Sequence, residues 1–245
     1  MKLPEKEKAA QKAAFRAMTL PQKAEHIYLY YKWPILLGLI ALIVLGSVVQ
    51  QQFTRKDAVL SVAFANVAVG EALESDLTDG FLRFLGADAK KREVYLYRDL
   101  YLSDNADTLN HEYAYASKMK LMGAIQAQRL DVVLMNREAY DLLSRSGYLL
   151  ELSPALFTEN AALYTQILPF LSSNEVVLSD NSIKYQLGEA ETLEVETETV
   201  RNALDVSGLP LFARAGFPDT VYIGVIANSG RLANCIEFVS YVSGS

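Results

Sequence analysis

Several residue types that build catalytic and metal sites are scarce in this sequence. There is one cysteine, Cys235, and there are two histidines, His26 and His111, so no internal disulfide can form and a zinc site of ordinary composition is excluded. Neither a Walker phosphate loop nor the spaced glycines of a dinucleotide fingerprint occur. We therefore expect no enzymatic activity, no cofactor and no metal.

Three local arrangements come closest to catalytic or metal-binding motifs. The sequence Asn228-Ser229-Gly230 lacks the glycine two residues before the serine that a nucleophile elbow requires. Asp104 and Asp107 lack the glycine and the terminal glutamate of a calcium-binding loop, which favours a solvated acidic loop. Spacing does not exclude a pair of Cys235 and His111, but Cys235 lies in the apolar pattern of the last helix, which indicates a small buried side chain.

Charged residues are absent from one long run, WPILLGLIALIVLGSVV, which spans residues 33–49. Extended to residue 53, this run predicts a transmembrane helix, with tyrosines and Trp33 where the chain enters the bilayer. Residues 1–32 carry seven Lys/Arg against three Glu, so we expect this basic head in the cytoplasm and residues 57–245 outside. A cleaved secretory signal and a buried core helix are the alternatives, and the length of the head argues against the signal.

The chain beyond the head is strongly acidic. It contains 16 basic and 26 acidic residues, and its longest basic cluster is Lys90-Lys91-Arg92. Because binding of a polyanion needs a basic face, we exclude nucleic acid as a partner. Residues 57–245 are enough for one domain with its own core, and that core must supply the stability that disulfides cannot.

Strand and helix patterns alternate along residues 57–245. Apolar, β-branched runs predict strands over 58–69, 93–98, 130–135 and 220–227. Helical spacing predicts helices over 71–85, 111–128, 136–147 and 231–242. Two further short strands are expected over 175–178 and 183–187, around a turn at 179–182, and the acidic segment 189–198 is expected to be exposed. This alternation predicts a mainly parallel α/β sheet.

Two passages carry a resemblance to a known family. DVVLMNREAYDLLSRSGYLLELS, residues 131–153, and VYIGVIANS, residues 221–229, followed by NCIEFVSY, residues 234–241, resemble segments of extracellular solute-binding proteins with the type 2 periplasmic-binding fold. In that family the first passage closes one lobe, and the second is the return of the chain to it. The head, with Tyr30-Tyr31-Lys32-Trp33, is also similar to membrane-anchored proteins of Gram-positive bacteria.

The resemblance implies one lobe of a type 2 periplasmic-binding fold, but the chain leaves little room for the other. Only residues 175–219 lie between the two passages, which is too few for a full second lobe. A domain without an opposing lobe cannot enclose a small solute as drug-sized ligands are enclosed in their pockets. We therefore expect a reduced or degenerate ligand cleft.

A remaining ligand site would lie at the carboxyl ends of the parallel strands, where helix N-termini present donors. Seven residues occupy those positions: Asn66, Arg98, Asp99, Asn136, Arg137, Asn228 and Ser229. Ordinary structure also explains several of them, since Asn136, Asn228 and Ser229 are good helix caps and Arg98 and Asp99 can form a local ion pair.

Two functional hypotheses follow from the sequence. The first is a membrane-tethered, extracytoplasmic, non-catalytic domain that resembles a solute-binding protein. The second is a scaffold or assembly component of a cell-envelope complex, which uses the α/β domain as a protein-docking surface. The expected partners are the lipid bilayer, through residues 33–53, and either a small solute or an envelope protein.

Overall fold

The computed structural model describes residues 17, 19, 21, 28, 32–34, 36–47, 56–105, 110–189 and 191–244. The chain divides into two units, Met1–Arg55 and Lys56–Ser245. In the first unit residues 36–47 are helical, and their large apolar side chains are exposed. Among the described residues no helix is both long enough and apolar enough to cross a membrane. Residues 35 and 48–53 of the predicted span, and most of the predicted head 1–32, lie outside the described residues.

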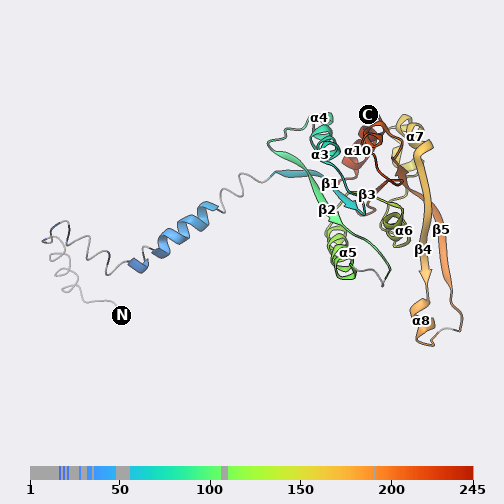
Figure 1. Ribbon diagram of the computed structural model, residues 1–245, viewed down its shortest axis with the longest axis horizontal. Helices are drawn as coiled ribbons and strands as arrows, with labels where there is room; N and C mark the ends of the chain where they lie inside the picture. The colour runs from blue at the N-terminus through green and yellow to red at the C-terminus, as the bar shows by residue number, and fades with distance from the viewer. Residues whose placement is uncertain are drawn as a thin grey trace. The chain divides into compact units, whose positions relative to one another are not determined.

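The second unit is a mixed α/β domain built on a six-stranded sheet with the order β2-β1-β3-β6-β5-β4 (Figure 1). Its strands are β1 (Asp57–Ala65), β2 (Arg92–Leu100), β3 (Val132–Met135), β4 (Leu171–Asp180), β5 (Val195–Asp205) and β6 (Tyr222–Val225). Its helices are α3 (Glu71–Ser75), the π-helix η1 (Asp76–Gly80), α4 (Phe81–Phe84), α5 (His111–Gln126), α6 (Arg137–Arg145), α7 (Ala161–Ile167), α8 (Ser182–Gln186), α9 (Pro210–Ala213) and α10 (Leu232–Gly244), with the 3-10 turns η2 (Pro154–Phe157) and η3 (Leu168–Phe170).

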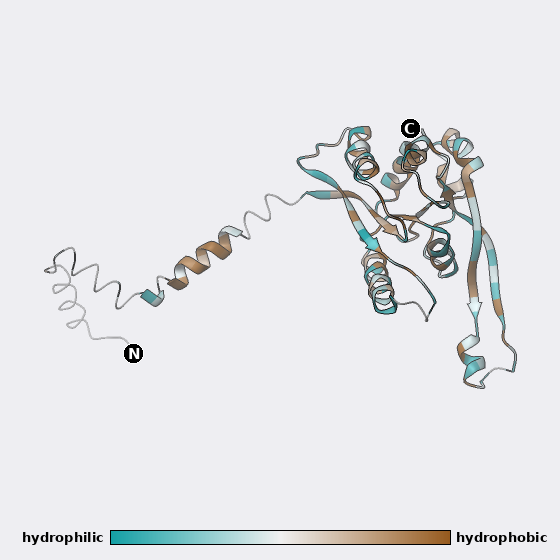
Figure 2. Ribbon diagram, viewed as in Figure 1, coloured by the Kyte–Doolittle hydropathy of each residue, from teal (hydrophilic) through white to brown (hydrophobic). Residues whose placement is uncertain are grey.

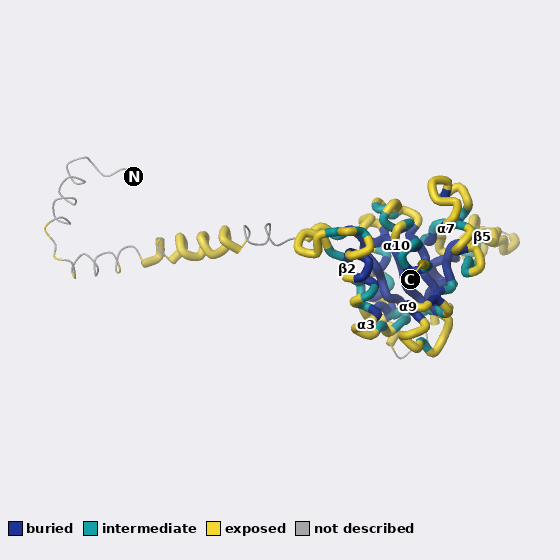
Figure 3. Tube along the Cα trace, turned by 90° about the horizontal axis from the view of Figure 1, so that it is seen from above, coloured by how far each residue is buried: buried dark blue, intermediate teal, exposed yellow. Residues whose placement is uncertain are grey.

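The helices cover the two faces of the sheet as separate layers. Alternating strand residues point to opposite faces, so Val62 and Phe64 of β1 join one hydrophobic cluster with α3, α4, α7 and α10. Ala63 and Ala65 of the same strand join a second cluster with α5 and α6. Figure 3 shows the buried chain concentrated at this sheet and the exposed chain at the periphery.

Local signals located most of the elements correctly. The predicted strands over 58–69, 93–98, 130–135 and 220–227 are confirmed as β1, β2, β3 and β6, with β1 ending earlier, at Ala65. The predicted helix over 71–85 is confirmed as the consecutive segments α3, η1 and α4, and those over 111–128, 136–147 and 231–242 are confirmed as α5, α6 and α10.

The prediction of a mainly parallel sheet is wrong. β1 is parallel to β2 and β3, but β6 is antiparallel to both β3 and β5, and β4 is antiparallel to β5. The connection from β5 to β6 contains the four-residue helix α9, so the chain turns back beside β5 without a long crossover helix. Parallel neighbours require such a crossover, and the sheet is therefore mixed.

The predictions for residues 175–198 are wrong in part. Residues 183–187 were expected as a strand, but Ser182–Gln186 form the helix α8, because a short apolar alternation fits one helical turn as well as a strand. The acidic segment is exposed as expected, yet from Val195 it forms the beginning of β5. The residues expected to build a small second lobe thus form mainly a β-hairpin with a helix at its end (Figure 1).

Candidate functional site

Three of the predicted ligand residues lie near one another at the carboxyl ends of β1 and β3. Asn66 follows β1, and its Nδ2 atom is 3.5 Å from the carboxylate of Glu138 in α6. Asn136 follows β3 and caps α6, since its Oδ1 atom accepts a hydrogen bond from the backbone N–H of Ala139 at 3.0 Å. Arg137 is the next residue, so the sequence correctly placed Asn66, Asn136 and Arg137 at one edge of the sheet.

The side chains at this edge already have partners within the protein. Asn66 has a left-handed φ of 57°, and its amide bonds both backbone groups of Leu102, at 2.7 Å and 2.6 Å. Arg137 pairs with Asp141 at 2.9 Å and lies over the ring of Tyr140, 5.4 Å from its centroid. These contacts fix the loop after β1 and the first turns of α6.

Arg98 and Asp99 both belong to the edge strand β2. Arg98 does not pair with Asp99 but with Glu74 of α3, through two hydrogen bonds, and hydrogen bonding to the guanidinium lowers the pKa of Glu74. Asp99 has a left-handed φ of 58°, and its carbonyl accepts a hydrogen bond from the hydroxyl of Tyr113. The expected local pair is thus replaced by two links from β2 to different helices.

Asn228 and Ser229 lie at the opposite edge of the sheet from Asn66 and Asn136. They follow β6, and because β6 runs antiparallel to β3, its carboxyl end lies beside the amino end of β3. The amide of Asn228 donates to the carbonyl of Ile125 at 2.8 Å. The seven predicted residues therefore do not converge on one cleft.

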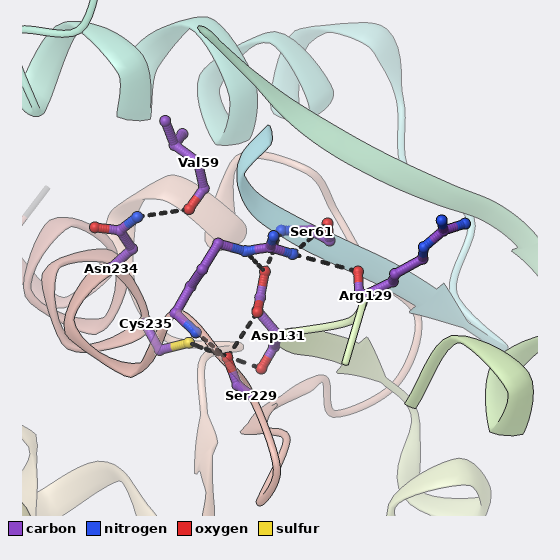
Figure 4. A network of polar contacts seen from close by, with 8 residues as sticks. Val59, Ser61, Arg129, Asp131, Ser229, Asn234 and Cys235 are labelled. Atoms are coloured by element: carbon purple, nitrogen blue, oxygen red, sulfur yellow. Dashed lines mark hydrogen bonds and ion pairs between the residues drawn. The ribbon is translucent and has the colours of Figure 1, made fainter. Parts of the chain in front are cut away.

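The amino end of β3 holds a buried polar network that sequence reasoning missed (Figure 4). The fully buried carboxylate of Asp131 accepts hydrogen bonds from the backbone N–H of Ser61 at 2.6 Å, the hydroxyl of Ser229 at 2.6 Å and Nε of Arg231 at 2.8 Å. Arg231 also donates to the hydroxyl of Ser61 at 3.1 Å. These residues join β1, the start of β3 and the segment before α10.

Cys235 lies beside this network, with its Sγ atom 3.5 Å from the hydroxyl oxygen of Ser229. The predicted burial of Cys235 is confirmed, since its side chain is inaccessible. Burial raises the pKa of the thiol from 9.0 to about 12, and a neutral thiol is a poor nucleophile. The role of this network is structural, because its hydrogen bonds hold the segment before α10 against β1 and β3.

Two open hollows of similar size lie on the surface of the domain. One, of about 390 Å³, lies between β2 and the α3–η1 segment and includes Arg98. The other, of about 410 Å³, lies between α6 and the β4–β5 hairpin and includes Arg137 and Arg145. In the second hollow Arg145 lies 4.0 Å from the carboxylate of Glu175, and Arg137 pairs with Asp141. Both arginines therefore have acidic neighbours. The part of the chain that the structure describes contains no cluster of acidic, histidine or cysteine side chains able to hold a metal ion. Of the acidic pair Asp104 and Asp107 in the sequence, Asp107 lies outside the described residues.

The most distinctive surface feature is the hairpin formed by residues 171–205, which we call the arm. It consists of β4, α8 and β5, and only Leu204 and Asp205 of β5 pair with β6. The remainder of the two strands extends beyond the sheet and carries α8 at its end (Figure 1). An isolated two-stranded hairpin is marginally stable in water, so the arm depends on its attachment to the domain.

The base of the arm is attached to α6 by buried and part-buried hydrogen bonds. The hydroxyl of Tyr140 donates to the carbonyl of Ser172 at 3.0 Å and to Oδ1 of Asn202 at 2.8 Å. The Asn202 amide in turn donates to the hydroxyl of Ser144 at 2.8 Å, and that hydroxyl donates to the carbonyl of Glu175 at 2.9 Å. Both strands of the arm are therefore fixed to one helix at their base.

The far end of the arm, residues 178–198, is ordered by Asn181, and we call it the tip. The Asn181 side chain donates to the carbonyl of Thr192 at 2.9 Å and accepts from the backbone N–H of Glu194 at 2.8 Å. Despite this order, large apolar side chains remain exposed there, including Ile183 at 72 % and Leu187 at 68 %. The others are Leu178, Tyr185, Leu193 and Val195. Figure 2 shows apolar and polar residues interspersed along the arm.

The tip is also strongly acidic. It holds six carboxylates against one basic residue, Lys184; the six are Asp180, Glu189, Glu191, Glu194, Glu196 and Glu198. The tip thus combines apolar contact area with a negative potential. The tip is a candidate functional site that the sequence did not predict. The sequence signal that could have located it is the alternation of Glu with Val and Thr over residues 195–200, which is typical of a strand.

Comparisons with known proteins leave the family open. No protein-family model matches the chain, and no curated protein and no solved structure matches it.

Proposed function

We propose that this protein is a docking component of the cell envelope, held at the membrane by residues 33–53 and presenting the arm to other proteins outside. The observation that carries the proposal is the tip, where apolar side chains such as Ile183 and Leu187 are exposed on an element whose base is fixed in the core. Large exposed apolar patches on soluble domains are typical of interaction surfaces. The partner that fits such a tip has an apolar surface bordered by basic residues.

The solute-binding hypothesis has less support from the geometry. A captured solute needs convergent polar groups in an enclosed pocket, whereas Asn66 and Asn136 lie at one edge of the sheet and Asn228 and Ser229 at the other. The residues expected to supply a second lobe form the arm instead. Saturable thermal stabilisation of the protein by sugars, peptides or amino acids would nevertheless favour a receptor over a docking component.

We also propose that the type 2 periplasmic-binding resemblance describes the origin of the domain. The resemblance implies that the second passage returns to the first, and β6 does pair with β3. The loop after α6 adds to this contact, because the backbone N–H of Leu150 donates to the carbonyl of Val225 at 2.8 Å. In this proposal the arm is what remains where a binding protein has its second lobe.

Membrane anchoring by residues 33–53 remains part of the proposal. It is supported by the helical residues 36–47, whose apolar side chains, such as Leu42, are exposed and require an apolar environment, and by the excess of Lys/Arg before them. Protease added outside intact cells should digest the domain and spare the head. Protection of the domain would overturn this topology.

Site-specific photo-cross-linking in native membranes tests the docking function. A photoreactive residue is placed in the full chain at Leu187 in the tip and, as a control, at the exposed Lys90 on the opposite side of the sheet. We expect discrete protein adducts from position 187 that Ile183→Asp abolishes. Thr199→Asp, which adds the same charge to an exposed position of the arm outside the tip, should preserve them. Equal labelling from positions 187 and 90, or adducts that Ile183→Asp leaves unchanged, would contradict a docking role for the tip.

A further inference from the structure

A second unusual surface lies on α5, on the other side of the domain from the arm. The inward face of this helix is formed by Ala114, Ser117, Leu121, Ala124 and Ile125. At 100° per residue, the directly opposite face contains Glu112, Tyr115, Ala116, Met119, Gly123 and Gln126. We call these six residues the outer face of α5. A helix on a protein surface normally places charged residues there, but Glu112 is the one charged residue on this face.

The outer face of α5 is both exposed and apolar. Tyr115 is 62 % and Met119 is 52 % exposed, and the half-buried Met122 lies beside them. Tyr115 and Met119 therefore present most of their area to solvent in the single chain. Apolar exposure of this kind is the same property that distinguishes the tip of the arm.

Gly123 adds a second, independent peculiarity to this face. It lies inside a sixteen-residue helix, where glycine is less favourable than alanine. A Cβ atom added at Gly123 would meet no other atom within 4 Å, so the packing of the domain itself does not require glycine there. A missing side chain in this place allows another chain to approach the helix backbone closely.

The charges around the outer face of α5 complement those of the tip. Lys118 and Lys120 flank the apolar residues on either side, and Arg129 follows the helix. Lys118 also forms an exposed ion pair with Asp104, at 3.0 Å, which contributes little to stability and exchanges readily. The tip carries six carboxylates against Lys184. Opposite charges bordering two apolar surfaces favour their association and select against wrong partners.

We infer that the tip of one copy of this protein docks on the outer face of α5 of a second copy. This inference rests on the proposed docking function of the arm and names its partner. Ile183 and Leu187 of the tip lie against Tyr115 and Met119, while the tip carboxylates face Lys118 and Lys120. Anchoring of both copies in one membrane confines them to a thin layer and so raises their effective concentration for each other.

Cysteine cross-linking between two differently tagged full-length chains tests the inference. The single native cysteine, Cys235, is buried, so it does not compete for oxidation. One chain carries Leu187→Cys in the tip and the other carries Met119→Cys on α5; the matched control replaces Met119→Cys by Lys90→Cys, which is also exposed. When the chains are co-expressed and their membranes mildly oxidised, we expect a disulfide-linked heterodimer whose yield is several-fold higher for the 187–119 pair than for the 187–90 pair.

Charge reversal provides a second readout on the same cross-link. Lys118→Glu with Lys120→Glu should reduce the 187–119 yield several-fold, and adding Glu194→Lys with Glu196→Lys on the other chain should restore it. Lys120, Glu194 and Glu196 are exposed and Lys118 is half-buried. None of the four belongs to the hydrophobic core, so the variants keep the core, which far-UV circular dichroism checks. Equal yields for the 187–119 and 187–90 pairs, or a yield indifferent to charge reversal, would overturn the inference.

The two tests also separate failure of the inference from failure of the docking function. Adducts from position 187 to other proteins, without a 187–119 cross-link, overturn the self-association and leave the docking function standing. Adducts from position 187 to lipid alone, without any 187–119 cross-link, overturn both proposals.

Discussion

Breaking the pair of Asp131 and Arg231 from one side should cost more stability than removing both charges. Arg231→Met keeps much of the side-chain volume but leaves the fully buried Asp131 carboxylate without its countercharge. Asp131→Asn in the same chain then removes that charge. The Asn amide can still serve both sides of the site, because its oxygen accepts from Ser61 and its NH2 group can donate to the hydroxyl of Ser229, which now acts as acceptor.

The structure sets the expected magnitudes. Removing one partner of a buried ion pair typically costs about 3–5 kcal/mol, whereas replacing the whole pair by neutral groups is often close to neutral. For a domain of this length, each kcal/mol corresponds to roughly 2–4 °C in Tm, so Arg231→Met should lower Tm by about 6–20 °C. The double variant should recover at least about 1 kcal/mol of that loss, because it no longer buries an unpaired charge.

Urea denaturation of residues 56–245 is the suitable assay. Trp33 is the one tryptophan of the chain and lies outside this segment, so unfolding is followed by far-UV circular dichroism. The comparison is valid where the dependence of the unfolding free energy on urea stays the same among the variants. A double variant that is less stable than Arg231→Met alone would refute the reasoning, since it would show that the buried carboxylate is not the source of the loss.

Three further predictions concern single residues of the core. Burial raises the pKa of the Cys235 thiol from 9.0 to about 12, so the unfolded state loses its proton first and stability should fall as pH rises from about 9 to 12, by at most about 1.4 kcal/mol per pH unit; Cys235→Ala should flatten this slope in urea titrations, and an unchanged slope would contradict it. Tyr140→Phe removes the hydroxyl that contacts the buried Asn202 amide oxygen and the Ser172 carbonyl, which should cost about 1–3 kcal/mol and speed amide exchange in the arm more than in β1, whereas uniform acceleration would argue against a local anchor. Gly80→Ala should destabilise, despite the helical preference for alanine, by about 1–3 kcal/mol, because the new Cβ meets the Tyr241 hydroxyl; adding Tyr241→Phe should restore part of the loss in thermal unfolding, and no recovery would assign the strain elsewhere.

The elements that could be predicted from the sequence are those with complete local signals. The helix α6 begins at Asn136, whose side chain caps it, and ends at Gly147, which has the left-handed φ of 71° that favours glycine. β3 is a run of four buried apolar residues. Each of these features depends on neighbours within a few residues along the chain, so sequence pattern was sufficient.

The relations that the sequence did not reveal are all of long range. The direction of β6 depends on where β5 ends. The first four residues of β5 belong to the segment 189–198, which was interpreted as acidic and exposed because its glutamates outnumber its apolar residues. The pair of Asp131 and Arg231 joins positions 100 residues apart, and no periodicity relates them. The predicted ligand residues failed to converge for the same reason, because their convergence assumed that every strand ends at one edge.

The acidic residues of the tip bear on how two copies can meet. Among the described residues, most of the two arm strands have no further strand beside them, since β5 pairs with β6 only at Leu204 and Asp205. Such edges tend to pair with each other between molecules, but in a tip-to-tip contact the six carboxylates of one copy would face six of the same sign on the other. Like charges held together cost free energy, so contact between the tips of two copies is disfavoured. The basic residues beside the outer face of α5 carry the opposite sign, and the same carboxylates that prevent the symmetric contact between tips therefore favour the contact between tip and helix.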